Sequence, residues 1–113
     1  MAITIINLEQ GMPTVPAALA RLNQGLRTAK ATGISTIKFI HGYGSSGQGG
    51  AIRKQVLLEL EKHRRNGMVK LVVPGEEFSP FFDNARRAID LHPDLCRDQD
   101  YARTNHGITI VIV

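Results

Sequence analysis

The spacing of apolar residues predicts that strands and helices alternate along the chain. Short runs rich in β-branched residues predict strands, and apolar residues three and four positions apart predict helices. The predicted strands are residues 2–8, 36–40, 68–73 and 107–113, and the predicted helices are 15–32, 51–66 and 79–91. The first two crossovers are long enough for right-handed βαβ units with parallel strands. The pattern therefore predicts an α/β domain in two or three layers.

Local signals mark the ends of the predicted helices. Thr14 followed by Pro16 predicts the start of the first helix, and Gly33 predicts its end. Ser79 and Pro80 carry the same start signal for the third helix. Three phenylalanines lie beside this start and are expected to anchor the third helix on the core: Phe78, Phe81 and Phe82.

Composition places the chain among single globular domains. It has 113 residues, of which 42% are hydrophobic and 21% charged, enough for a packed core without a metal or a disulfide. We expect one domain over residues 1–113. The single cysteine cannot pair within the chain, which favours a reducing, cytoplasmic location. No apolar run is long enough to span a membrane, and the first residues lack the pattern of a signal peptide.

Charge divides the chain into two unequal parts. Residues 1–75 carry ten basic and three acidic residues, whereas residues 76–113 carry four basic and seven acidic ones. A polyanion would prefer the first part. Ordinary surface charge on a basic domain is the alternative interpretation.

The most unusual segment follows the second predicted strand. Glycine supplies five of the nine residues 42–50, directly after His41 and before a predicted helix. A glycine-rich turn leading into a helix N-terminus directs backbone N–H groups at one place, which favours a phosphate ligand. The spacing Gly42-x-Gly44-x-x-Gly47 formally matches the dinucleotide fingerprint, but the third glycine comes too early for its helix, and the Walker pattern fails for lack of its lysine. A turn without any ligand remains the plainer alternative.

The four histidines and one cysteine do not point to a metal site. None of them falls at the spacing of zinc ligands, and the aspartates near residue 98 lack the glycine and distal glutamate of a calcium loop. We therefore expect neither a metal nor a cofactor. His41 is different because it ends a strand beside the glycine-rich turn, where a ring nitrogen could move a proton or bond a phosphate. A buried ring that bonds backbone is the alternative.

The residues His41-Gly42-Tyr43-Gly44, with Ile52-Arg53 in the next helix and Gly107-Ile108-Thr109-Ile110-Val111 near the end, resemble an Smr (small MutS-related) domain over nearly the whole chain. The resemblance implies a fold similar to the C-terminal domain of translation initiation factor three, with an antiparallel last strand. It also implies binding of DNA or RNA and, in several family members, endonuclease or nicking activity. Residues 76–106 are then an acidic insertion that carries the third helix.

Two departures from the family pattern weaken the nuclease expectation. Where the family has Leu-Asp-Leu-His-Gly, this chain has Asn7 in place of the acid and Glu9 in place of the histidine. His41 is then the main candidate for proton transfer, with Glu9 as the second. The residues expected to contact nucleic acid are Lys38, Gly42, Tyr43, Gly44, Ser45, Ser46, Gly47, Arg53 and Lys54.

The function expected from these observations is nucleic-acid binding of the Smr type, with weak or lost nuclease activity. Two alternatives stay open: a domain that binds a nucleotide or phosphate ligand with the same loop, and a protein-interaction module. The sequence does not distinguish DNA from RNA or indicate an oligomeric state.

Overall fold

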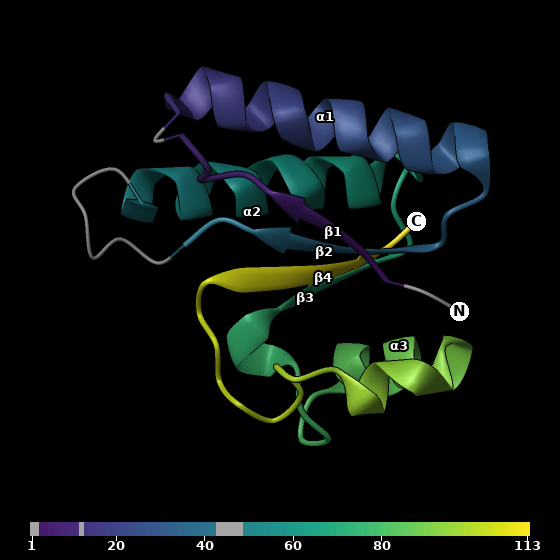
Figure 1. Ribbon diagram of the computed structural model, residues 1–113. Helices are drawn as coiled ribbons and strands as arrows, with labels where there is room; N and C mark the ends of the chain where they lie inside the picture. The colour runs from purple at the N-terminus through teal and green to yellow at the C-terminus, as the bar shows by residue number, and fades with distance from the viewer. Residues whose placement is uncertain (1–2, 12, 43–48) are drawn as a thin grey trace.

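A four-stranded sheet lies between two layers of helices in the computed structural model, which describes residues 3–11, 13–42 and 49–113 (Figure 1). The strands are β1 (Thr4–Asn7), β2 (Thr36–Ile40), β3 (Leu71–Pro74) and β4 (Ile108–Ile112). The α-helices are α1 (Val15–Thr32), α2 (Gly49–Arg65) and α3 (Asp83–Leu91), and two 3₁₀ helices are η1 (Gly75–Glu77) and η2 (Pro93–Arg97). The predicted α/β class and the predicted order of elements are confirmed.

The sheet has the strand order β1-β2-β4-β3. β1 and β2 are parallel, and β4 lies between β2 and β3 and is antiparallel to both. The antiparallel direction expected from the family resemblance is therefore confirmed. One consequence decides where a site can form: β1, β2 and β3 all end at the edge of the sheet where β4 begins. The expected likeness to translation initiation factor three stays a prediction.

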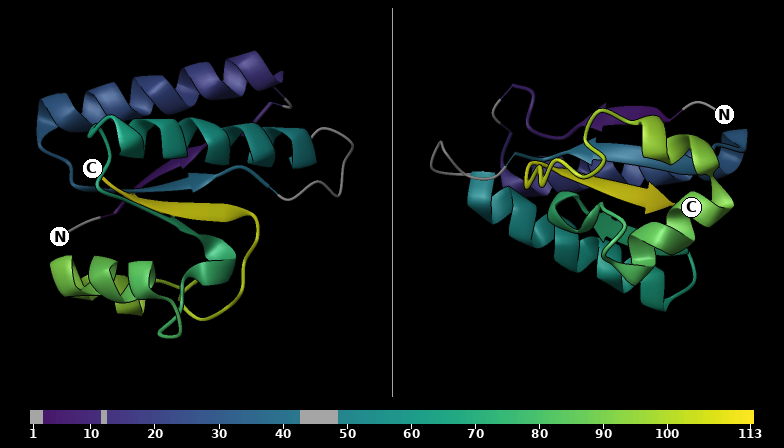
Figure 2. Two further views of the ribbon diagram at one scale, coloured as in Figure 1. Left: turned by 180° about the vertical axis from the view of Figure 1, so that it is seen from behind. Right: turned by 90° about the horizontal axis from the view of Figure 1, so that it is seen from below.

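The first face of the sheet packs against α1 and α2 (Figures 1 and 2). Alternate residues of a strand point to opposite faces. Ile37 and Phe39 of β2 and Val111 of β4 accordingly join one hydrophobic cluster with the apolar stripes of both helices. Gly25 in α1 lets β1 come close, because a Cβ atom there would overlap the Ile6 side chain.

The second face packs against α3 and η2 (Figure 2). Its cluster contains Val73 of β3, Ile110 of β4, Ala88 of α3 and Leu95 of η2, all of them fully buried. Residues 75–106 therefore cover a face that the first two helices leave open. That this segment is an insertion within a single domain stays a prediction.

The predicted caps of the first helix are confirmed. The Thr14 hydroxyl accepts a hydrogen bond from the Ala17 amide at 3.2 Å. Gly33 adopts a left-handed backbone with a φ of 75°, and its amide donates to the Ala29 carbonyl. Both features depend on adjacent residues only, which is why the sequence predicts them well.

The predicted start of the third helix is wrong. Ser79 and Pro80 form a turn in which the Phe82 amide donates to the Ser79 carbonyl at 3.3 Å, and α3 begins only at Asp83. Serine followed by proline is also a favoured start for a type I turn, and the sequence signal is shared by both structures. Of the three phenylalanines only Phe78 is buried, whereas Phe81 is 85% exposed.

Within the described ranges, no helix is both long enough and apolar enough to cross a membrane.

Candidate nucleic-acid interface

The candidate site lies at the edge of the sheet where three strands end and β4 begins. His41 and Gly42 follow β2, Glu76 follows β3 in η1, and Gly107 precedes β4. The backbone closes this edge, because the amides of His41 and Gly42 both donate to the Gly107 carbonyl, at 2.9 and 3.0 Å. α2 also begins at this edge of the sheet (Figure 1).

His41 is buried inside the sheet and linked to β4. Its Nδ1 lies 2.7 Å from the Gly42 carbonyl and its Nε2 lies 2.8 Å from the Thr109 hydroxyl. Since a carbonyl can only accept, Nδ1 carries the proton, and Nε2 accepts from Thr109. Burial lowers the pKa of His41 below its usual value and outweighs the hydrogen bond to Gly42, which raises it.

This geometry favours the structural alternative for His41. Burial lowers the pKa of the ring, which has no exposed surface and already has a partner at each nitrogen. Proton transfer to a ligand would first require the ring to leave the Thr109 hydroxyl. The predicted catalytic role of His41 therefore lacks a geometric basis in this conformation.

Asn7 is the last residue of β1, and Glu9 lies in the turn that follows. The Asn7 side-chain oxygen accepts hydrogen bonds from the Glu9 and Gln10 amides, at 2.9 and 3.0 Å. Asn7 therefore stabilises the turn, as short polar side chains commonly do. The exposed Glu9 carboxylate lies against Gly42, where an added Cβ would overlap it. Gly42 also has a φ of 70°, a conformation that favours glycine.

Arg53 forms the central group of the site. Its guanidinium makes an ion pair with the Glu76 carboxylate, and its Nε donates to the His106 carbonyl at 3.2 Å. The His106 ring lies close to the same carboxylate, with Nδ1 3.7 Å from Glu76 Oε2. Burial by itself raises the pKa of Glu76, but its own backbone N–H and the Arg53 guanidinium outweigh burial and hold that pKa below its usual value.

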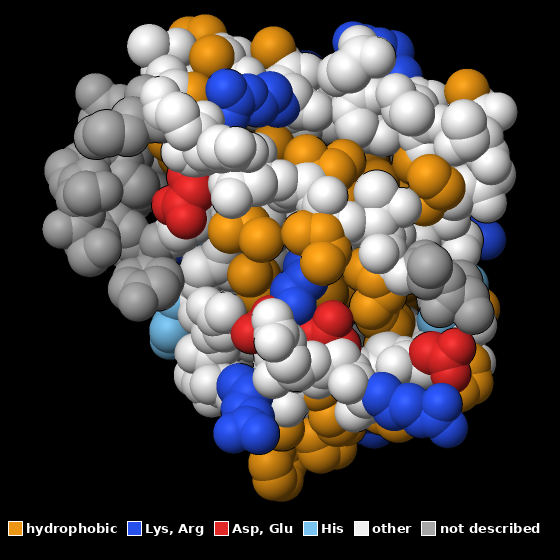
Figure 3. Space-filling view, viewed as in Figure 1, with side chains coloured by type: hydrophobic (Ala, Val, Ile, Leu, Met, Phe, Trp, Pro, Cys, Tyr) orange, Lys and Arg blue, Asp and Glu red, His pale blue; other side chains and the backbone are white. Residues whose placement is uncertain are grey.

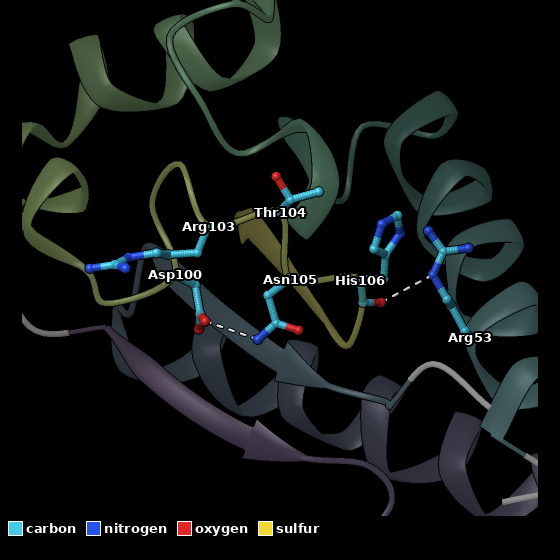
Figure 4. Close-up of a pocket in the computed structure, with 6 residues that line it drawn as sticks. All are labelled: Arg53, Asp100, Arg103, Thr104, Asn105 and His106. Atoms are coloured by element: carbon cyan, nitrogen blue, oxygen red, sulfur yellow. Dashed lines mark hydrogen bonds between the residues drawn. The ribbon is translucent and has the colours of Figure 1, made fainter. Parts of the chain in front are cut away.

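A groove of about 760 Å³ runs beside this cluster (Figure 4). It is lined by Arg53, Asp100, Arg103, Thr104, Asn105 and His106. Figure 4 shows Arg53 and His106 side by side, while Arg103 points away from them. Two residues of the turn that forms this wall have positive φ angles, Ala102 at 61° and Thr104 at 56°. Such strained positions occur at functional sites more often than elsewhere.

Lys38, which the sequence analysis included among the nucleic-acid contacts, is paired within the fold. It points to the α3 face of the sheet and is only 2% exposed. Its ammonium forms ion pairs with Asp98, at 2.9 Å, and with Asp100. A phosphate contact from Lys38 would break both pairs, so we leave it out of the interface.

The remaining predicted contact residues divide between described and undescribed parts of the chain. Lys54 is exposed on α2, next to Arg53. The residues Tyr43, Gly44, Ser45, Ser46 and Gly47 lie outside the described residues. Among the residues that are described, no group of three or more His, Cys, Asp or Glu could hold a metal ion.

Two members of the site were not predicted as contact residues: Glu76 and His106. Both come from distant parts of the chain, one directly after β3 and the other shortly before β4. Once β4 is taken as antiparallel, these positions must lie at the edge that also receives the ends of β1 and β2. An antiparallel last strand was therefore the feature from which the place of Glu76 and His106 in the site could have been predicted.

The described basic side chains are spread out on the face of the molecule shown in Figure 3. On the face shown in Figure 3, Lys and Arg form several separate groups with hydrophobic side chains between them. The side chain of Arg21 in α1 stabilises the turn after β1, because it donates a hydrogen bond to the Gln10 carbonyl at 2.7 Å.

The fold and this edge define a class of protein: a small α/β domain that places a glycine-rich connection and an arginine-bearing helix at the ends of its parallel strands. A family model described as the Smr domain matches residues 10–77, which is more than half of the chain. The chain therefore belongs to the Smr domain family.

A solved structure supports this assignment over the whole length of the chain. The crystal structure of the Smr domain of Thermus thermophilus MutS2 is similar with a TM-score of 0.57 and 26% sequence identity. The match covers 96% of this chain and 95% of that one. No curated protein matches this chain. Smr domains are known generally as domains that bind or nick nucleic acids.

Proposed function

We propose that this Smr domain binds the phosphate backbone of a nucleic acid at the edge where β1, β2 and β3 end. The observation that carries the proposal is the position of Arg53, which lies at this edge together with the exposed His106 and the start of α2. Arginine recognises phosphate through two parallel hydrogen bonds, and the free amides of a helix N-terminus attract an anion. The first turn of α2 has no acidic residue that would repel one.

The expected affinity depends strongly on salt. Contacts from Arg53, Lys54, the amides of α2 and the glycine-rich connection would neutralise roughly four phosphates. Counterion release then gives a slope of about −4 for log affinity against log salt on duplex DNA. Affinity that is absent at low salt, or that hardly changes with salt, would contradict a backbone-binding site.

Single substitutions locate the interface. Arg53→Ala and Lys54→Ala should each weaken binding uniformly across sequences and reduce the salt slope by about one. Lys70→Ala is the matched control, since Lys70 is exposed at the opposite edge of the sheet, before β3. Fluorescence anisotropy with labelled single-stranded and duplex DNA and RNA measures the affinity of each variant and its dependence on salt. If Lys70→Ala weakens binding as much as Lys54→Ala does, the interface lies elsewhere.

We further propose that cleavage is weak or absent. Asn7 supports a turn, Glu9 replaces a histidine and His41 is buried with both ring nitrogens bonded, so the acid and the histidine of the family motif are missing here and His41 is not free to move a proton. Loss of such a group removes about 10² to 10⁴ in rate. Labelled DNA and RNA should therefore stay intact while bound. Robust cleavage by the natural protein would contradict this proposal, and its survival in both His41→Ala and Glu9→Gln would place the proton carrier at another residue.

Competition separates the other candidate functions in the same assay. If ATP or NAD displaces the oligonucleotide at micromolar concentration, the site takes a nucleotide ligand. If neither oligonucleotides nor nucleotides bind, the remaining candidate is a protein-interaction module.

A further inference from the structure

Glu76 occupies the position beside Arg53 where a phosphate group would be expected. Its carboxylate pairs with the Arg53 guanidinium and lies 3.7 Å from the His106 ring. A carboxylate and a phosphate accept the same paired hydrogen bonds from a guanidinium. Here the Glu76 carboxylate accepts from the Arg53 Nη2 and the His106 carbonyl accepts from its Nε, so the protein itself already satisfies two of the guanidinium groups that would bind an external phosphate.

The backbone holds Glu76 in this position. Gly75 packs so closely against the segment before β4 that an added Cβ would overlap the Asn105 carbonyl. This close approach places Glu76 next to His106, although 30 positions of sequence separate them. The side chain of Glu76 is 25% exposed, and that of Arg53 is also 25% exposed, so a ligand can reach the pair.

The pairing is incomplete on the side of the carboxylate. Glu76 Oε1 is buried and has no hydrogen-bond partner among the described residues. A buried oxygen without a partner is costly, which limits the net free energy that the pair contributes to the folded state. A backbone phosphodiester, which has two non-bridging oxygens as acceptors, could replace this carboxylate at Arg53 without breaking a fully satisfied network.

We propose that Glu76 is an internal competitor for phosphate, which holds Arg53 in the free protein and sets the affinity of the site. This inference rests on the proposed function and adds the residue that regulates it. Binding of a backbone phosphate at Arg53 requires Glu76 to give up the guanidinium. The carboxylate also repels incoming phosphates, so it favours ligands with several simultaneous contacts over single anions.

The test removes the charge of Glu76 and keeps its shape. Glu76→Gln should tighten oligonucleotide binding by about fivefold, the ratio that corresponds to one partly exposed ion pair. Glu77→Gln is the matched control, because it makes the same change in net charge at the adjacent residue, and it should change the affinity by less than about twofold. Anisotropy at fixed ionic strength gives both values.

A double-mutant cycle shows whether Glu76 acts through Arg53. In an Arg53→Ala background the gain from Glu76→Gln should fall to that of the Glu77→Gln control. A full gain in that background, or equal gains for the two glutamate variants, overturns the proposal and leaves only a general charge effect.

A second measurement separates this inference from the proposed function. Inorganic phosphate is titrated into each variant, and NMR follows the Arg53 Nε–H and the His106 ring. Saturation at about fivefold lower phosphate in Glu76→Gln than in the natural protein supports the competition even if no oligonucleotide binds, in which case only the proposed function fails. Equal phosphate affinities, together with equal oligonucleotide affinities, overturn the inference while the proposed function stands.

Circular dichroism checks that each variant is folded. If Glu76→Gln fails to fold, Glu76→Asp replaces it, since aspartate keeps the charge but shortens the reach to Arg53 by one methylene. The gain in oligonucleotide affinity from Glu76→Asp should exceed the gain from Glu77→Asp. If the two variants have equal affinities, the proposal is contradicted.

Discussion

Replacing Lys38 with methionine should destabilise the protein strongly. Lys38 is 2% exposed, and its ammonium is paired with Asp98 and Asp100, whose side chains are 11% and 13% exposed. Methionine fills most of the same volume, so the substitution removes the charge with little loss of packing. It leaves two carboxylates close together in a poorly hydrated place, and removing one partner of a buried ion pair costs about 3–5 kcal/mol. Because both carboxylates keep some contact with water, we expect the lower end, about 3 kcal/mol.

Urea unfolding measures the loss, and a triple variant tests its cause. Lys38→Met should lower the urea midpoint without changing the slope of the transition. Adding Asp98→Asn and Asp100→Asn should recover at least half of the loss, because the amide oxygens can still accept from the Asp100 backbone and from Asn105. A loss below about 1 kcal/mol for Lys38→Met would refute the reasoning. So would a triple variant no more stable than the single one.

The same network sets the dependence of stability on pH. Burial alone lowers the pKa of Lys38, but hydrogen bonds to Asp100 and Asp98 outweigh it and hold that pKa above 10.5. Burial alone raises the pKa of Asp100, but Asn105 and Lys38 outweigh it and hold that pKa below 3.8. The contribution of Asp100 is therefore lost as the pH falls below about 4, and that of Lys38 is lost as the pH rises above about 10.5. The difference in unfolding free energy between the natural protein and Lys38→Met should shrink at both ends of the pH range.

Two further substitutions test the geometry of the edge. Gly75→Ala should cost about 2 kcal/mol in urea unfolding, because the new Cβ would overlap the Asn105 carbonyl. Gly50→Ala is its control and should be neutral or slightly stabilising, since nothing lies within 4 Å of the added atom and alanine favours a helix. Thr109→Val should cost about 1–3 kcal/mol, because it removes the hydroxyl that donates to the buried His41 Nε2. An unchanged urea midpoint for Thr109→Val would contradict the conclusion that this hydrogen bond satisfies the buried ring of His41.

The parts of the fold that the sequence predicts well depend on short stretches of chain. The cap at Thr14, the end at Gly33 and the order of elements all follow from residues within a few positions of one another. The start of α3 could not be predicted in this way, because Ser79 and Pro80 favour a turn as much as a helix. Boundaries also shifted where tertiary pairing decides them: β3 was expected at residues 68–73 and is found at Leu71–Pro74, in register with β4.

The candidate site was predicted less completely than the fold. Arg53 and Lys54 follow from their place after the glycine-rich segment, but Glu76 and His106 join them only through the antiparallel placement of β4. The burial of Lys38 was not predicted, for a related reason. A lysine in a strand usually faces water, and nothing in the aperiodic sequence of residues 93–106 indicates that this segment covers the other face of the sheet.

The charge asymmetry of the sequence does not carry over directly to the surface. Residues 1–75 are strongly basic, and residues 76–113 are acidic, but the two parts share one sheet. Acidic residues of the second part pair with Lys38 and Arg53, two basic residues of the first. The field that an approaching polyanion meets is therefore weaker than the charge count of the first part indicates. In the proposed site, the affinity for nucleic acid then depends on whether the ligand can displace the Glu76 carboxylate from Arg53. One carboxylate can therefore control binding, although the net charge of the domain is +4.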